Sequence, residues 1–134
     1  LDLLRDLQAQ SGMAIILITH DLGVVAEMAD EVAVMYAGRV VERTSGTAIF
    51  DDPQHPYTLG LLGSIPKLEE THERLLAIEG AVPPPFALPS GCRFHPRCVF
   101  AAAECSREDP ALRQIGADPH QVACLRAPVE ELVA

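Results

Sequence analysis

Four cysteines near the carboxyl end of the chain are the residues with the clearest capacity for chemistry. Cys92, Cys98, Cys105 and Cys124 fall within 33 residues at intervals C-x5-C-x6-C-x18-C, and the 91 residues before them contain no cysteine. Such clustering indicates a shared purpose. Three chemistries compete for it: disulfide bonds, a zinc site and an iron–sulfur cluster. Four free, buried thiols are the plainer alternative.

The spacing of these cysteines favours an iron–sulfur cluster over a zinc site. Zinc sites usually contain a pair of cysteines only two to four residues apart, and neither short interval here is that tight. Longer intervals suit a [4Fe–4S] cluster, which four thiolates hold. The spacing does not match the ferredoxin runs, so cluster, zinc and metal-free thiols stay open in that order of preference. His95 and His120 lie beside the set, but four cysteines already complete a site.

His20 is the second candidate for chemistry. It follows the apolar run 13–18, half of which is β-branched, and this pattern predicts a central parallel strand covered on both faces. Asp21 can cap a helix over 22–29, which places His20 in a strand-to-helix turn. Nucleotide-binding α/β sheets carry their chemistry at this end of a strand. The plainer interpretation is that His20 has only a structural role at the end of a core strand.

The elements around these candidates are expected to be short. Residues 1–12 have helical spacing and end at a glycine, and residues 31–42 predict two strands folded back at Ala37-Gly38. Residues 45–50 predict about one and a half helical turns, and Pro56 can start a helix that runs to Leu62.

A proline-rich stretch separates these elements from the cysteines. Residues 80–91 contain Pro83, Pro84, Pro85 and Pro89, so several backbone donors are missing and extended or turn conformations are expected. We expect an ordered connector, because its apolar side chains can pack; these are Val82, Phe86 and Leu88.

The residues around His20 resemble the switch-histidine region, or H-loop, of ATP-binding-cassette (ABC) ATPases. The similar stretches are Ile18-Thr-His-Asp-Leu22 and Val34-Met-Tyr-Ala-Gly-Arg-Val-Val-Glu42. The resemblance implies that His20 donates a hydrogen bond to the γ-phosphate of ATP and stabilises the charge that develops during transfer. His20 is therefore both the catalytic and the cofactor-binding candidate, with ATP and Mg as cofactors held mostly by residues upstream.

A longer resemblance begins at Asp52-Pro-Gln-His-Pro-Tyr-Thr-Leu59. This block is similar to the His-Pro-Tyr motif that opens the C-terminal extension of oligopeptide, dipeptide and nickel ABC importer ATPases, and the similarity continues through the four cysteines. It implies an α/β fold in two parts. Residues 1–43 are the end of a P-loop ATPase core, with the H-loop and its hairpin, and residues 44–134 are a Pro- and Cys-rich irregular extension. We expect His55 and Tyr57 to pack the extension against the core.

The same resemblance implies a function in peptide import. It implies an ATP-hydrolysing subunit, peripheral at the cytoplasmic face of the membrane, that works with a second ATPase subunit, with permease subunits and, indirectly, with a peptide-binding protein. Lys67 is the only lysine, and the Gly-rich phosphate loop is absent, so we expect this chain alone to be inactive. This cytoplasmic location also argues against disulfide bonds between the four cysteines, because disulfides are rare in a reducing cytosol. A metal-binding structural or regulatory module without its own activity is the alternative function.

Composition excludes other classes of protein. Ten basic against nineteen acidic side chains give a net charge of −9, and the arginines are scattered, which argues against a nucleic-acid partner. No stretch approaches 18 uninterrupted apolar residues. An apolar content of 49% argues against a secreted disulfide scaffold. We also expect residues 1–43 to leave apolar faces exposed, because one core strand cannot bury itself. The sequence does not indicate which solute such an importer would transport.

Overall fold

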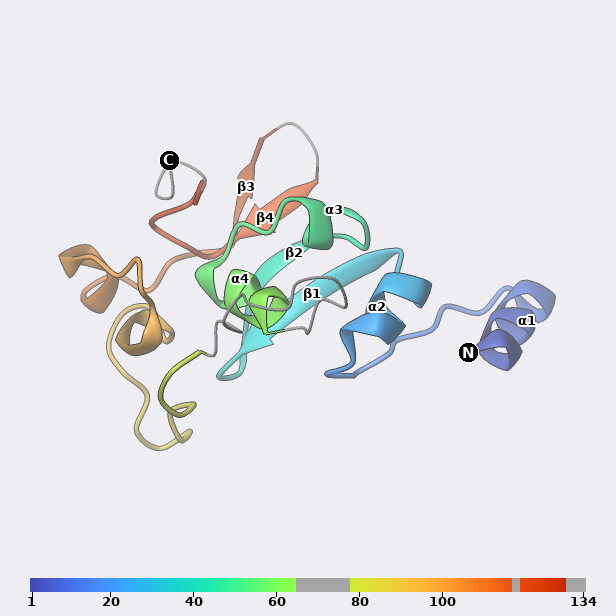
Figure 1. Cartoon of the computed structure of the whole chain (residues 1–134), viewed down its shortest axis with the longest axis horizontal. Coiled ribbons are helices and arrows are strands. Elements are labelled where there is room, and N and C mark those ends of the chain that lie inside the picture. The colour runs from blue at the N-terminus through green and yellow to red at the C-terminus, as the bar shows by residue number, and fades with distance from the viewer. Residues whose placement is uncertain (65–77, 117–118, 130–134) are drawn as a thin grey trace, which may run out of the picture.

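An antiparallel sheet lies at the centre of the computed structural model, which describes residues 1–64, 78–116 and 119–129. Within these residues the sheet has four strands in the order β1-β2-β4-β3. The strands are β1 (Glu31–Tyr36), β2 (Arg39–Ser45), β3 (Arg113–Ile115) and β4 (His120–Val122). Figure 1 shows the short helices α3 and α4 beside the sheet, and α1 projecting away from it on the side opposite the yellow and orange loops of residues 80–106.

The hairpin of β1 and β2 forms where the sequence predicts it. The two strands pair antiparallel from Glu31↔Ser45 to Tyr36↔Arg39. The two residues between them have positive φ, 46° at Ala37 and 79° at Gly38. Positive φ at both central positions matches the twist of a two-residue hairpin. The predicted reversal at Ala37-Gly38 is therefore confirmed.

The helices also begin and end close to their predicted positions. Their bounds are α1 (Asp2–Ser11), α2 (Leu22–Met28), α3 (Ala48–Asp51) and α4 (Pro56–Gly63), with the 3-10 turns η1 (His95–Arg97) and η2 (Ala103–Ser106). The side chain of Asp21 accepts the backbone N–H groups of Gly23 and Val24 at 2.9 and 3.2 Å, which is the expected N-cap. Gly12 ends α1 in the left-handed conformation.

The predicted central strand at residues 13–18 is wrong for this structure. No strand is assigned there, and Ile16 and Ile18 are 91% and 96% exposed. A strand needs a neighbour for its backbone donors and acceptors, and the described residues place none beside this run. Apolar faces in residues 1–43 are thus exposed, as expected from one unpartnered core segment.

The extension is less irregular than predicted. β4 pairs with β2 through Glu42↔Val122 and Arg43↔Gln121, and β3 pairs with β4. The backbone N–H of Ala123 donates to the carbonyl of Val41 at 2.8 Å. Strands of three residues are too short to show a period in the sequence. The carboxyl end of the chain therefore completes the same sheet that the first hairpin begins.

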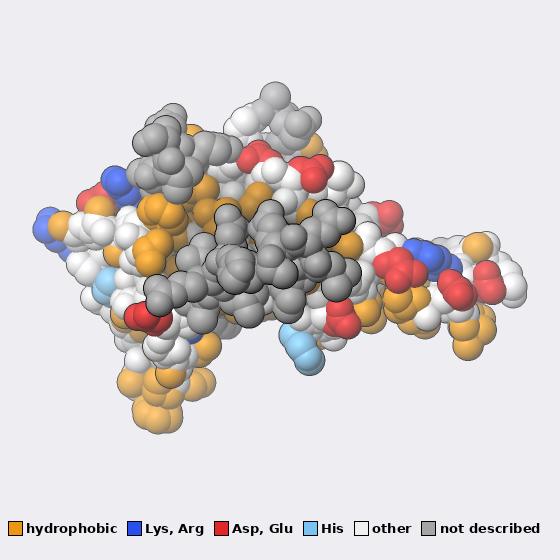
Figure 2. Space-filling model, viewed as in Figure 1, with side chains coloured by type: hydrophobic (Ala, Val, Ile, Leu, Met, Phe, Trp, Pro, Cys, Tyr) orange, Lys and Arg blue, Asp and Glu red, His pale blue; other side chains and the backbone are white. Residues whose placement is uncertain are grey.

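Hydrophobic packing is concentrated where the extension meets the hairpin. One buried cluster consists of Tyr36, Val41 and Phe94, and a second consists of Val122, Cys124 and Ala127. The proline-rich loop lies outside both clusters. Val82, Phe86 and Leu88 are 55%, 90% and 38% exposed, so the prediction that they pack is wrong. Figure 2 shows hydrophobic side chains gathered at the protruding tip that this loop forms.

Candidate functional site

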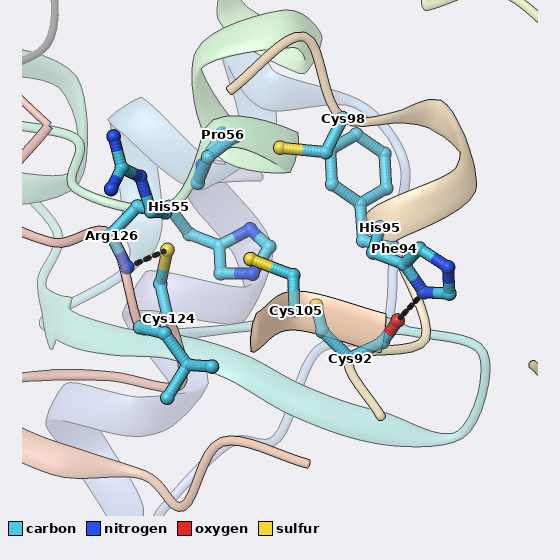
Figure 3. Close-up of a pocket in the computed structure, with 10 residues that line it drawn as sticks. His55, Pro56, Cys92, Phe94, His95, Cys98, Cys105, Cys124 and Arg126 are labelled. Atoms are coloured by element: carbon cyan, nitrogen blue, oxygen red, sulfur yellow. Dashed lines mark hydrogen bonds between the residues drawn. The ribbon is translucent and has the colours of Figure 1, made fainter. Parts of the chain in front are cut away.

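The four cysteines, though up to 32 positions apart in the chain, line a single pocket. Cys92 precedes η1, Cys98 follows it, Cys105 lies within η2, and Cys124 follows β4 by two residues. All four thiols are free. Figure 3 shows them around a common space together with the other lining residues, which are His55, Pro56, Phe94, His95, Leu125 and Arg126.

A close backbone contact brings the first and third cysteines together. The N–H of Cys92 donates to the carbonyl of Cys105 at 2.8 Å. Gly91, immediately before Cys92, has φ of 68°, and a β-carbon there would lie 2.4 Å from the same carbonyl oxygen. Only glycine fits this approach without displacement. Gly91 therefore allows the turn before Cys92 to lie directly against the backbone of Cys105.

The loop between Cys92 and Cys98 is anchored to the β1–β2 hairpin by an aromatic side chain. Phe94 is 3% exposed, and its ring centroid lies 5.1 Å from that of Tyr36 and 5.4 Å from that of Tyr57. Edge-on aromatic contacts of this kind add to the stabilisation that burial provides. The Tyr57 ring also lies 4.7 Å from that of Tyr36. The His-Pro-Tyr segment thus packs against both the hairpin and the cysteine loop, as predicted for Tyr57.

Two arginines fix the same loop through backbone carbonyls. Arg93 donates to the carbonyl of Ala37 in the hairpin turn. The Arg97 guanidinium lies over the Tyr36 ring, 5.9 Å from its centroid. Arg97 also donates to three carbonyls of the incoming chain, those of Ile78, Glu79 and Gly80. The cysteine loop is therefore attached to the hairpin independently of β4.

Burial has the largest effect on the acidity of three of the thiols, Cys92, Cys98 and Cys124. It raises the pKa of Cys92 and Cys124 above the ordinary value and raises the pKa of Cys98 to about 11. Backbone N–H donors oppose this effect, as at Cys124 Sγ, which accepts from Arg126 N–H at 3.3 Å. A metal bound here would have to displace protons at neutral pH.

The pocket does not contain a ready mononuclear metal site. Within residues 1–64, 78–116 and 119–129, no three His, Cys, Asp or Glu side chains form a group that could hold a metal ion. Neither the predicted [4Fe–4S] cluster nor its zinc alternative is therefore supported by this geometry. The four thiols share one pocket without closing on a single ion.

The nearby histidines are occupied elsewhere. His95 Nδ1 donates to the carbonyl of Cys92 at 2.8 Å, and its ring points away from the sulfurs in Figure 3. His55 Nδ1 accepts from Tyr57 N–H at 3.0 Å, and its ring also bonds to the backbone of Ala123. Burial lowers the pKa of His55 to about 4, so this ring is neutral at pH 7.

Glu42 is the residue that sequence reasoning missed. Its side chain is fully buried. Oε1 accepts from Gln54 N–H at 2.6 Å and from His120 Nε2–H at 2.7 Å, and Oε2 accepts from His55 N–H at 2.9 Å. The period of the strand places it on the face of Val40 and Thr44, which is the only sequence signal of its burial. His120, which lies beside the cysteines in the sequence, is buried and is the partner of this carboxylate.

His20 lies apart from the cysteine pocket. It is exposed, in the bend immediately before the capped start of α2. The Thr19 hydroxyl oxygen accepts the Asp21 N–H at 2.9 Å, which shapes this turn. The predicted position in a turn that opens a helix is confirmed, whereas its role toward ATP stays a prediction.

None of the helices in the described part of the chain has the length and apolar character needed to cross a bilayer.

Comparison with known proteins identifies what the chain is similar to. Residues 41–105 match the family described as oligopeptide/dipeptide transporter, C-terminal region. A peptide import ATP-binding protein of Brucella melitensis biotype 1 is 47% identical over 133 residues, covering 99% of this chain and 40% of the relative. The dipeptide transport ATP-binding protein of Escherichia coli (strain K12) is 46% identical over 124 residues, covering 92% and 38%. The chain thus spans about two fifths of the length of these relatives.

Proposed function

Because this chain belongs, through residues 41–105, to the oligopeptide/dipeptide transporter C-terminal family, we propose that it is the C-terminal portion of the ATP-binding subunit of a peptide importer. The observation that carries this proposal is similarity along 99% of the chain to a peptide import ATP-binding protein. In this proposal residues 1–43 close the ATPase core and residues 44–134 form the extension.

His20 is the residue of this chain that acts on ATP. Its exposed imidazole stands at the turn that Asp21 caps, free of the cysteine pocket and accessible to a nucleotide. It donates a hydrogen bond to the γ-phosphate and stabilises charge in the transition state of hydrolysis. Magnesium and the remaining phosphate contacts belong to residues outside this chain, which has no Gly-rich phosphate loop.

The partners follow from this function. ATP hydrolysis drives the permease subunits in the membrane, a second ATPase subunit completes the pair, and the peptide-binding protein delivers the solute. The subunit works at the cytoplasmic face of the membrane as a peripheral protein. Reconstituting the full-length subunit with its permease tests this: peptide-stimulated ATP hydrolysis is expected, and hydrolysis that no peptide alters would reject peptide import.

The cysteine pocket is the basis of a second proposal. We propose that Cys92, Cys98, Cys105 and Cys124 hold a [4Fe–4S] cluster that fastens the extension. A [4Fe–4S] cluster needs four thiolate ligands, and four thiols line this pocket. Backbone N–H groups donate hydrogen bonds to two of the sulfurs, those of Cys105 and Cys124. Arg126, which lines the pocket, has a buried Nε with no hydrogen-bond partner among the described residues. An anionic centre suits a pocket with such a donor beside it.

Anaerobic preparation tests the cluster. About four iron and four sulfide per chain are expected, with visible charge-transfer absorption, and each Cys→Ser substitution should lower the iron and sulfide content. Val99→Ser is the matched control, because Val99 lies in the same loop and is 88% exposed. A colourless protein whose stability is unaffected by all four Cys→Ser substitutions would reject the proposal. Zinc in place of iron would retain the site and change its chemistry.

A further inference from the structure

We propose that Glu42 is a positioning residue that sets Cys124 against the other three cysteines, acting through His120 and His55. This inference rests on the proposed four-cysteine site, and it names a role for residues outside the ligand set. Glu42 lies in β2, within the hairpin that follows α2, so it connects that hairpin with the cysteine pocket.

The first step is the burial of the carboxylate. Glu42 is 0% exposed and accepts three hydrogen bonds of 2.6 to 2.9 Å, from Gln54 N, His55 N and His120 Nε2. A carboxylate is tolerated inside a protein when such donors replace the water that it loses. The two backbone donors come from one segment and the imidazole comes from another. One side chain therefore joins three parts of the chain.

The second step leads to Cys124 through β4. Two residue pairs hold β4 to β2, Glu42↔Val122 and Arg43↔Gln121, and the Ala123 N–H adds one backbone hydrogen bond to the Val41 carbonyl. His120 opens β4, and Cys124 follows that strand by two residues. A strand with so few ladder bonds depends on side-chain contacts for its position. The hydrogen bond from His120 to Glu42 supplies a buried contact at the start of β4.

The third step leads to the opposite wall of the pocket. Glu42 binds the N–H groups of Gln54 and His55, and the His55 ring lines the pocket with its centroid 5.8 Å from that of Phe94. The same ring bonds to the backbone of Ala123, the residue before Cys124. Both routes from Glu42 therefore converge on the backbone that carries Cys124.

The other three cysteines are held differently. Cys92 and Cys98 flank a loop that Arg93, Phe94 and Arg97 attach to the hairpin, Arg97 through Tyr36. Cys105 is held to Cys92 by a backbone hydrogen bond. Loss of Glu42 should thus move Cys124 while leaving the other three in place. This selectivity separates a positioning role from general stabilisation.

The experiment measures the alkylation rate of each cysteine by mass spectrometry, in native, metal-free chain. Glu42→Gln replaces one acceptor oxygen with an amide that cannot accept the same donors. Cys124 should react about tenfold faster in this variant, since its segment opens more often, while Cys92, Cys98 and Cys105 keep their wild-type rates. Glu31→Gln is the control, because Glu31 lies in the same hairpin and pairs with Arg43 at the surface.

His120 provides a second pair of variants. His120→Leu removes the donor and should reproduce the selective effect on Cys124, whereas His120→Gln keeps an N–H donor and should restore part of the wild-type rate. If Glu42→Gln does not fold, these two variants decide the outcome. Equal acceleration of all four thiols, or an unchanged rate at Cys124, would overturn the inference.

Metal loading separates this inference from the proposal it rests on. Wild-type chain that takes up no iron anaerobically rejects the cluster, and the alkylation rates still report whether Glu42 positions Cys124. If the wild-type chain takes up a cluster, that cluster should survive longer in the presence of a chelator than the cluster of the Glu42→Gln variant. Equal cluster content and equal lifetime in both would overturn the positioning role and leave the cluster intact.

Discussion

Gly91 lies against the carbonyl of Cys105, so close that a β-carbon on residue 91 would stand 2.4 Å from that oxygen. Gly91→Ala should therefore lower the free energy of unfolding by about 2 kcal/mol or more, through positive φ and displaced backbone, and should expose Cys92 and Cys105 to alkylation. Urea unfolding and thiol labelling measure both effects.

The matched control for this change is Gly116→Ala. Gly116 also has positive φ, 64°, but nothing lies within 4 Å of the point where a β-carbon would stand, so it isolates the conformational cost. Equal destabilisation by the two substitutions would mean that the contact with Cys105 has no effect of its own.

Burial of His55 predicts a pH dependence of stability. Its folded pKa of about 4 lies below the ordinary value of 6.5, so the unfolded chain binds a proton first as pH falls. The free energy of unfolding should therefore be unaffected by protonation of His55 above pH 6.5. It should fall progressively between pH 6.5 and about pH 4, by up to about 3 kcal/mol in total. Unfolding curves of wild type and His55→Gln across this range measure it. Parallel pH profiles for the two proteins would contradict the prediction.

The raised pKa of Cys98 predicts slow thiol chemistry. The thiolate is the nucleophile, and burial raises the pKa of Cys98 from 9.0 to about 11. Between pH 7 and 9, native metal-free chain should therefore alkylate at Cys98 far more slowly than the same chain in urea. Rates at Cys98 that match in the two states would show that burial does not control this thiol.

The proposed role of His20 predicts a specific loss of turnover. In the full-length subunit, His20→Ala should lower the rate of ATP hydrolysis by about 10²-fold, the scale for removing one preorganised transition-state donor. Nucleotide affinity should change little, because the binding contacts lie elsewhere. Steady-state hydrolysis and equilibrium nucleotide titration separate the two effects. A variant that hydrolyses ATP at the normal rate would remove His20 from the mechanism.

Local chemistry determines the elements that the sequence predicts well. Asp21 caps α2 with its own carboxylate, Gly12 ends α1, and the reversal at Ala37-Gly38 needs only two residues with positive φ. The spacing of the cysteines likewise predicts a common purpose, and they do line one pocket. Each of these features depends on residues close together in the chain, or on residue type alone.

Tertiary structure decides what depends on distant partners. The run at 13–18 has the composition of a core strand and is exposed, since a strand exists only beside another strand. β4 is too short to predict and forms because β2 pairs with it. Glu42 reads as a surface residue in the sequence, and it is buried because donors from residues 12 to 78 positions away converge on its carboxylate. Such convergence is a property of three-dimensional packing, which no local pattern encodes.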